Sequence, residues 1–173
     1  MMESPKLNAI KKELLQTPKE VLISYCLRMA KHKIENKELL HYLIFEQGDN
    51  TEYKSQIKEM LKSAFEELPF SEYQAAKTLR KTLRLMNKHI KFMGDKVDEA
   101  ETVAYFCELF MRTKFVKSRQ ASLINLLFRN LLRIQKIIPK LEEDLQFDLQ
   151  KEFDALIEEL TLARPGFHQH DLR

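Results

Sequence analysis

The sequence predicts an all-α fold of about eight helices in antiparallel hairpins. Apolar residues recur at helical spacing in every long segment, and no segment of useful length alternates apolar and polar residues with a period of two. Turn and capping residues fall between these segments. The chain has 173 residues, so we expect one helical domain over residues 1–163 and a flexible C-terminal tail over residues 164–173.

Start and stop signals place the first three helices. Ser4, followed by a proline, is expected to cap the first helix. Thr17 is expected to open the second by accepting a hydrogen bond from a backbone N–H three residues on. Asn36 starts the third helix, and Gly48 is expected to end it by adopting a left-handed backbone.

The next three helices have equally clear boundaries. One apolar face runs over residues 53–68, and Ser71 opens the helix that follows. Gly94 is expected to terminate that helix. Asp95 or Asp98 then caps the sixth, whose apolar residues at helical spacing point inward.

The last two helices are expected to start after Ser118 and Pro139. The seventh is apolar around most of its circumference, which predicts that it is the central element of the fold. The eighth is expected to bury one stripe of apolar side chains. These are Leu145, Leu149, Phe153, Leu156 and Leu160.

The spacing of the helices favours an α-α superhelix. The fourth helix is expected to begin near Thr51 and the sixth near Lys96, a step of 45 residues. This step is similar to the period of about 40–47 residues in HEAT-type repeats, a resemblance of period and layout only. A HEAT-like stack is therefore the predicted architecture, and an irregular helical bundle is the alternative.

Charge is distributed unevenly along the chain. The total is 29 Lys and Arg against 26 Asp and Glu, a net charge of +3. Residues 71–140 carry most of the excess positive charge, whereas residues 141–173 are strongly acidic. No Asp or Glu occurs from residue 73 to 94 or from 109 to 141.

Within these stretches, ten cations are expected to form one basic face on the fifth and seventh helices. Side chains spaced in this way fall on one side of a helix, opposite its apolar stripe. The ten residues are Lys77, Arg80, Lys81, Arg84, Lys88, Lys91, Arg129, Arg133, Lys136 and Lys140. Because like charges three or four residues apart repel, something acidic is expected to compensate them.

Two acidic partners are possible. An external partner is an acidic protein surface or the backbone of a nucleic acid, which binds Lys and Arg through its phosphates. The internal alternative is the acidic helix over residues 141–163, which would make the protein a structural or regulatory subunit. Few aromatic residues accompany the cations: Phe92 lies in the basic stretch of the fifth helix and Phe128 in that of the seventh. Stacking of nucleic acid bases on aromatic rings is therefore poorly supported.

The sequence gives no reason to expect an enzyme or a bound cofactor. With three glycines, it has no glycine-rich phosphate loop. Glu38 and His41 have the spacing of a di-iron ligand pair, but the second copy that such a site needs is missing. A helical-bundle enzyme with a metal site is thus the least favoured alternative, and we expect no catalytic, cofactor-binding or metal-binding residues.

Location and assembly follow from the remaining patterns. No apolar stretch reaches the roughly 20 residues of a membrane span, and the start of the chain lacks the apolar core of a signal peptide. Cys26 and Cys107 are expected to be free thiols in a reducing compartment, so we expect a cytoplasmic protein without membrane contact. The many apolar residues of the second and third helices favour a homodimer through the N-terminal helices.

Overall fold

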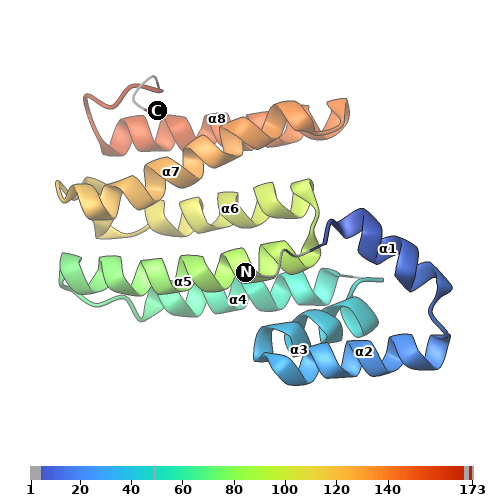
Figure 1. Cartoon of the computed structure of the whole chain (residues 1–173). Helices are drawn as coiled ribbons and strands as arrows, with labels where there is room; N and C mark the ends of the chain where they lie inside the picture. The colour runs from blue at the N-terminus through green and yellow to red at the C-terminus, as the bar shows by residue number, and fades with distance from the viewer. Residues whose placement is uncertain (1–4, 49, 170–171, 173) are drawn as a thin grey trace. The chain divides into compact units, whose positions relative to one another are not determined.

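The structure is a computed structural model that describes residues 5–48, 50–169 and 172. These residues are predominantly helical and include no strand (Figure 1), so the predicted all-α class is confirmed. Their contacts gather in two compact units, residues 1–48 and residues 49–173, which we call the N-terminal unit and the C-terminal unit. The single domain expected over residues 1–163 stays a prediction.

The N-terminal unit contains α1 (Leu7–Gln16), α2 (Lys19–His32), α3 (Ile34–His41) and a π-helical turn, η1 (Tyr42–Glu46). α2 and α3 pack against each other. Asn36 does not start α3, because the helix begins two residues earlier; its side chain instead donates to the backbone oxygen of Met29 at 2.9 Å. Among the described residues of this unit, only Tyr42 is fully buried.

Two helix-end signals in the N-terminal unit act differently from the sequence expectation. The Thr17 hydroxyl donates to the carbonyl oxygen of Glu13 at 2.8 Å, so it closes α1 and does not cap α2. Gly48 does not take a positive φ, because the chain leaves α3 through the π-helical turn and not through a left-handed cap. The expected cap Ser4 lies outside the described residues.

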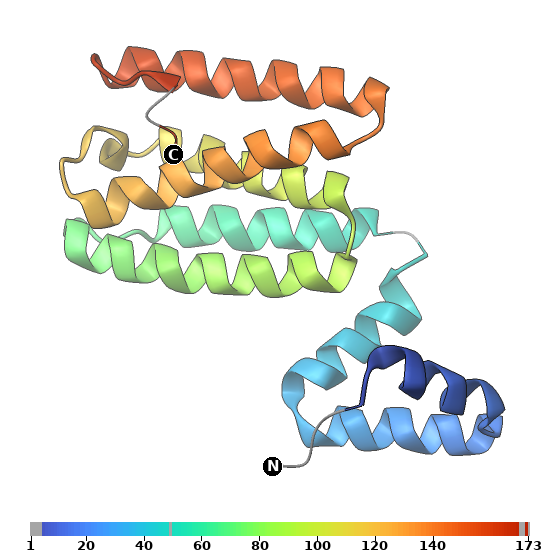
Figure 2. The ribbon, with the colours of Figure 1, turned by 45° about the horizontal axis from the view of Figure 1, so that its top comes forward.

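The C-terminal unit arranges its helices in two layers. They are α4 (Thr51–Glu66), α5 (Glu72–Met93), α6 (Lys96–Met111), α7 (Ala121–Ile137) and α8 (Glu143–Ala163), with short 3-10 turns η2 (Lys114–Lys117) and η3 (Ile138–Lys140). α4, α6 and α8 lie side by side in one layer, and α5 and α7 form the other (Figures 1 and 2).

In the first layer, α4 and α6 run parallel. At the start of α4, the Lys54 ammonium donates to Glu101 of α6 at 3.3 Å, 47 residues along the chain. At the end of α4, the ring of Phe65 packs against that of Phe110, with 6.5 Å between the ring centroids. Both contacts join residues at nearly the same separation, so the α6–α7 hairpin follows α4–α5 with about the step expected from the sequence.

The boundary between α5 and α6 is formed as the sequence predicts. Gly94 has φ 70° and ends α5 in the left-handed conformation. The Asp95 side chain accepts hydrogen bonds from the backbone N–H groups of Val97 and Asp98, at 2.7 and 3.1 Å. By contrast, Ser71 occupies the N-cap position of α5 without a side-chain capping bond, and α7 begins at Ala121, after η2.

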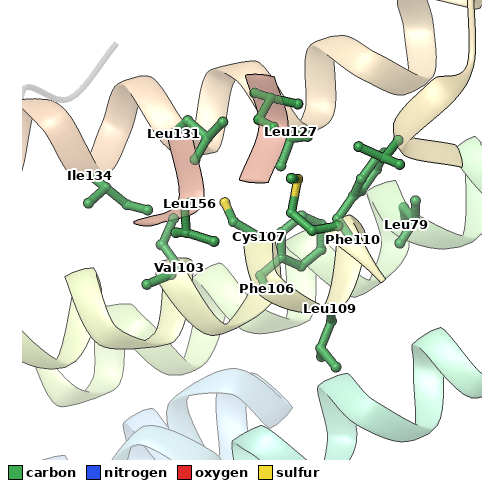
Figure 3. Packing of buried hydrophobic residues seen from close by; sticks show 14 of the residues in the cluster. Leu79, Val103, Phe106, Cys107, Leu109, Phe110, Leu127, Leu131, Ile134 and Leu156 are labelled. Atoms are coloured by element: carbon green, nitrogen blue, oxygen red, sulfur yellow. The ribbon is translucent and has the colours of Figure 1, made fainter. Parts of the chain in front are cut away.

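The central helix of the C-terminal unit is α6, not α7 as the sequence suggested. α6 contacts α4, α5, α7 and α8, and Figure 3 shows its side chains among those of the surrounding helices. Val103, Phe106, Cys107 and Phe110 are almost completely inaccessible. The apolar composition of α7 led to the wrong expectation, because several of its apolar residues are only half-buried in the structure.

The chain after α8 packs back onto the C-terminal unit where it is described. Arg164 Nη1 donates to the backbone oxygens of Val116 and Ser118, at 2.8 and 2.7 Å. Phe167 and Leu172 are buried against the core. The flexibility expected of residues 164–173 stays a prediction, part of which falls outside the described residues. In α8 itself, the expected apolar stripe is buried except for Leu145, which is exposed.

Candidate functional site

The ten cations of the basic face lie on α5, α7 and η3 of the C-terminal unit. Since α5 and α7 are neighbours in one layer (Figure 2, green and orange), the two rows of cations belong to adjacent helices. Lys88 and Arg133 are half-buried. The exposed members are Lys77, Arg80, Lys81, Arg84, Lys91, Arg129, Lys136 and Lys140.

Two arginines of the basic face reach across the seam between α5 and α7. Arg80 Nη2 donates to the backbone oxygen of Ser122 at 3.4 Å. Farther along the same seam, Arg133 Nη1 donates to Asn87 Oδ1 at 2.6 Å. The residues joined are 42 and 46 positions apart, so α5 and α7 run parallel, as α4 and α6 do. These contacts fix the spacing of the two rows.

Arg133 belongs to the basic face, but its charge is compensated inside the molecule. Its Nε and Nη2 atoms lie 2.8 and 2.7 Å from Glu99 Oε1, and Lys96 Nζ lies 2.6 Å from Glu99 Oε2. Burial acts to raise the pKa of Glu99, but hydrogen bonds from Lys96 and Arg133 and the charges of both outweigh it and lower the pKa. Arg133 therefore contributes structure more than free positive potential.

The eight exposed cations are not paired in this way. Among residues 5–48, 50–169 and 172, no carboxylate oxygen lies within 4 Å of any of them. Two of them bond to backbone oxygens: Arg80 to that of Ser122, and Arg84 Nε to that of Arg80 at 3.4 Å. The basic face thus carries a solvent-facing positive field in the part of the chain that the structure describes.

The carboxylates of α8 lie in the other layer. α8 packs mainly on α6 and contacts α7 only slightly, and its acidic side chains are exposed. They are Glu143, Asp144, Asp148, Glu152, Asp154, Glu158 and Glu159, and Glu142 at the N-cap position is exposed as well. Burial, followed by the charges of Glu108 and Glu101 on α6, raises the pKa of Glu152. Negative charge therefore gathers over α6 and α8.

Two exposed aromatic rings near the start of α5 escaped the sequence reasoning. Phe70 is 89% exposed and Tyr73 is 72% exposed. Tyr73 stands one helical turn before Lys77, so it falls within the sector of the basic face. Lys114 Nζ lies 4.3 Å from the centroid of the Phe70 ring. The sequence did contain a signal of their exposure, because neither ring fits the apolar stripe of the neighbouring helix.

The structure does not assemble the residues that the sequence offered for catalysis or metal binding. Among the described residues, no group of three or more His, Cys, Asp and Glu side chains could hold a metal ion. The His41 ring packs on Phe45, with 5.0 Å between centroids. Burial raises the pKa of the Cys107 thiol far above its ordinary value, which keeps the thiol protonated and unreactive.

Comparison of the chain with known proteins adds no assignment. No helix in the described part of the chain is both long and apolar enough to cross a bilayer. No protein-family model matches the sequence, and no match was found among curated proteins or solved structures. The basic face is therefore interpreted from its own geometry.

Proposed function

We propose that this protein is a non-enzymatic helical-repeat module that binds an acidic partner through the basic face. The observation that carries this proposal is the exposure of eight cations on two adjacent helices, with no carboxylate within 4 Å among the described residues. Like charges at such spacing repel one another. A bound polyanion removes that repulsion and releases counterions, which favours association.

Between the two external partners, Phe70 and Tyr73 favour the nucleic acid. Both rings are exposed at the start of α5, next to the cations of the same helix and of η2. Proteins that hold single strands combine a basic track with aromatic rings on which bases stack. An acidic protein surface would use the cations and leave the two rings without a role.

The test is binding of a fluorescently labelled single-stranded oligonucleotide, followed by anisotropy over a range of salt concentrations. If about four phosphates are contacted, the logarithm of the association constant falls with the logarithm of salt concentration with a slope of about −3. The double variant Lys81→Glu/Lys136→Glu is expected to bind at least about tenfold more weakly, because it reverses one charge on each row.

A matched control separates the basic face from net charge alone. The variant Lys62→Glu/Lys151→Glu makes the same change in net charge on α4 and α8, at exposed positions outside the basic face. It is expected to retain most of the affinity. Equal loss in both double variants, or no association with RNA, DNA or an acidic protein at low salt, contradicts the proposed function.

The internal alternative requires ion pairs that the described residues do not form. A regulatory subunit neutralised by its acidic helix needs the carboxylates of α8 near the cations of α5 and α7, but α8 lies in the layer of α4 and α6. Replacing the exposed carboxylates Asp148, Glu152 and Glu159 of α8 with amides distinguishes the two without removing core residues. Under the internal alternative, these substitutions increase affinity for polyanions strongly, whereas under the proposed function the change is small.

The HEAT-like superhelix and the cytoplasmic location remain parts of the proposal. The superhelix is supported by the parallel seams of the C-terminal unit, where hydrogen bonds join residues 42 to 48 positions apart. These separations match the repeat step expected from the sequence.

A homodimer through the N-terminal unit is the second candidate. A groove of about 690 Å³ between α1 and α2 is lined by apolar side chains such as Leu14 and Met29, together with Lys12 and Glu13. One charge of each sign in the lining suits a two-fold contact between identical surfaces. Light scattering is expected to give twice the monomer mass, and Leu14→Glu/Met29→Glu to give the monomer. A wild-type monomer at all working concentrations contradicts the dimer.

A further inference from the structure

A second cluster of cations surrounds an open pocket at the junction of η2, α7 and the chain after α8. The pocket has a volume of about 520 Å³ and is lined by Lys117, Arg119 and Arg164, with the Phe128 ring as an apolar wall. Among the residues that the structure describes, no acidic side chain lines it. None of the ten cations of the basic face contributes to this lining, so the pocket is a separate feature of the C-terminal unit.

The pocket is held open by contacts between its two sides. Arg164 Nη1 binds the backbone oxygens of Val116 and Ser118, which fixes the guanidinium against the loop that carries the other two cations. Gly166 has φ 97°, a conformation that turns the chain back toward the core. The buried ring of Phe167 then packs on Phe128, with 5.2 Å between centroids.

These contacts leave hydrogen-bond donors available for a ligand. A guanidinium has five N–H groups, and the two on Nη1 are those used in the backbone bonds of Arg164. The Nε and Nη2 groups make no hydrogen bond among the described residues. Lys117 and Arg119 are exposed and form no ion pair within that part of the chain. Three cationic side chains with no carboxylate among the described lining residues match a doubly charged oxyanion.

The size and apolar wall of the pocket specify the ligand further. A volume of about 520 Å³ falls in the range of small-molecule sites and exceeds what one phosphate group fills. The Phe128 ring provides a surface for a flat or apolar group next to the cations. We propose that this pocket binds a small organic phosphomonoester, with its phosphate held by Lys117, Arg119 and Arg164 and its organic part against Phe128.

The test is isothermal titration of the full-length protein with phenyl phosphate and, separately, with inorganic phosphate. Phenyl phosphate is expected to bind at one site, about fivefold more tightly than inorganic phosphate because of its contact with Phe128. The variant Lys117→Gln/Arg119→Gln is expected to bind phenyl phosphate at least about tenfold more weakly. In Phe128→Leu, the preference for phenyl phosphate over inorganic phosphate is expected to disappear.

A control pair distinguishes the pocket from general electrostatic attraction. The variant Lys62→Gln/Lys151→Gln removes the same charge from exposed positions of α4 and α8, outside both the pocket and the basic face, and is expected to leave phenyl phosphate binding unchanged. Equal weakening in both double variants, no weakening in either, or equal affinity of wild-type protein for the two ligands overturns the proposal. The oligonucleotide assay on the same variants tests the basic face independently, since a site for a small phosphomonoester does not require nucleic acid binding.

Discussion

The two units of the chain use apolar residues in opposite ways. In the N-terminal unit, large side chains such as Ile34 and Phe45 are 69% and 71% exposed, and only Tyr42 is fully buried among the described residues. In the C-terminal unit, one continuous core surrounds α6. Both units have amphipathic helices, so an apolar stripe does not by itself ensure burial. The difference is that α6 is covered by helices from both layers, whereas the described helices of the N-terminal unit do not enclose one another in this way.

The largest contrast expected between the units is in thiol reactivity. Cys26 of the N-terminal unit is half-buried, whereas Cys107 of the C-terminal unit is fully buried with a raised pKa. Labelling of Cys107 requires opening of the core, which costs close to the global free energy of unfolding. We expect a disulfide reagent to modify Cys26 at least about 1,000-fold faster than Cys107.

The thiol experiment is read from the absorbance of the released reagent, with Cys26→Ser as the control. In that variant the fast phase is expected to vanish and the slow phase to remain. Two fast thiols would mean that the core around α6 opens readily. Two slow thiols would mean that the N-terminal unit is covered in solution, which would remove the contrast between the units.

The second contrast is in the cost of removing an apolar side chain. Phe106→Ala empties a position of α6 that has no solvent exposure and is expected to lower the free energy of unfolding by about 3–5 kcal/mol. Ile34→Ala in the N-terminal unit is expected to change it by less than about 0.5 kcal/mol, because the side chain is already mostly in water. Urea denaturation of both variants checks this, and similar losses would contradict the contrast.

Local sequence signals predicted the C-terminal unit best where they act within a few residues. Gly94 and Asp95 specify one helix end and the next helix start, and the structure forms both as expected. Thr17 is also a good capping residue, but its hydroxyl found an acceptor in the preceding turn instead. A hydroxyl can both donate and accept, so its sequence position leaves both outcomes open.

Features that depend on distant residues were beyond the sequence reasoning. The composition of α7 suggested a central helix, but centrality is decided by how many helices pack around an element, and that element is α6. Arg133 fits the basic stripe by its spacing, and only the folded chain brings Glu99, 34 residues away, within 2.8 Å of it. The aromatic rings of Phe70 and Tyr73 were missed because their exposure is a property of the fold.

A smaller contrast between the two units is expected in the stability lost when a lysine ammonium group is removed. Lys54 of the C-terminal unit lies 2.9 Å from Asp98, a nearly buried carboxylate, and the hydrogen bond to Asp98 is the main cause of its raised pKa. Lys54→Met leaves Asp98 with Asn50 as its remaining side-chain donor and is expected to lower the free energy of unfolding by about 1–3 kcal/mol. Lys11→Met, at an exposed position of α1, is expected to have little effect. Thermal denaturation compares the two.

The smallest expected effect is a dependence of stability on acid pH that is confined to the C-terminal unit. The pKa of Glu99 lies below its ordinary value of 4.5 in the folded protein, so its contribution is fully present above pH 4.5 and decreases as the pH falls through the lower, folded-state pKa. Glu99→Gln is expected to lower the free energy of unfolding by about 1 kcal/mol at pH 7 and by less at pH 3. Glu35→Gln, at an exposed position of α3, is expected to change the free energy of unfolding by less than about 0.5 kcal/mol. If the effect of Glu99→Gln were as large at pH 3 as at pH 7, the ion pairs with Lys96 and Arg133 would not be its source. A change of equal size and pH dependence in Glu35→Gln would mean that this dependence on acid pH is not confined to the C-terminal unit.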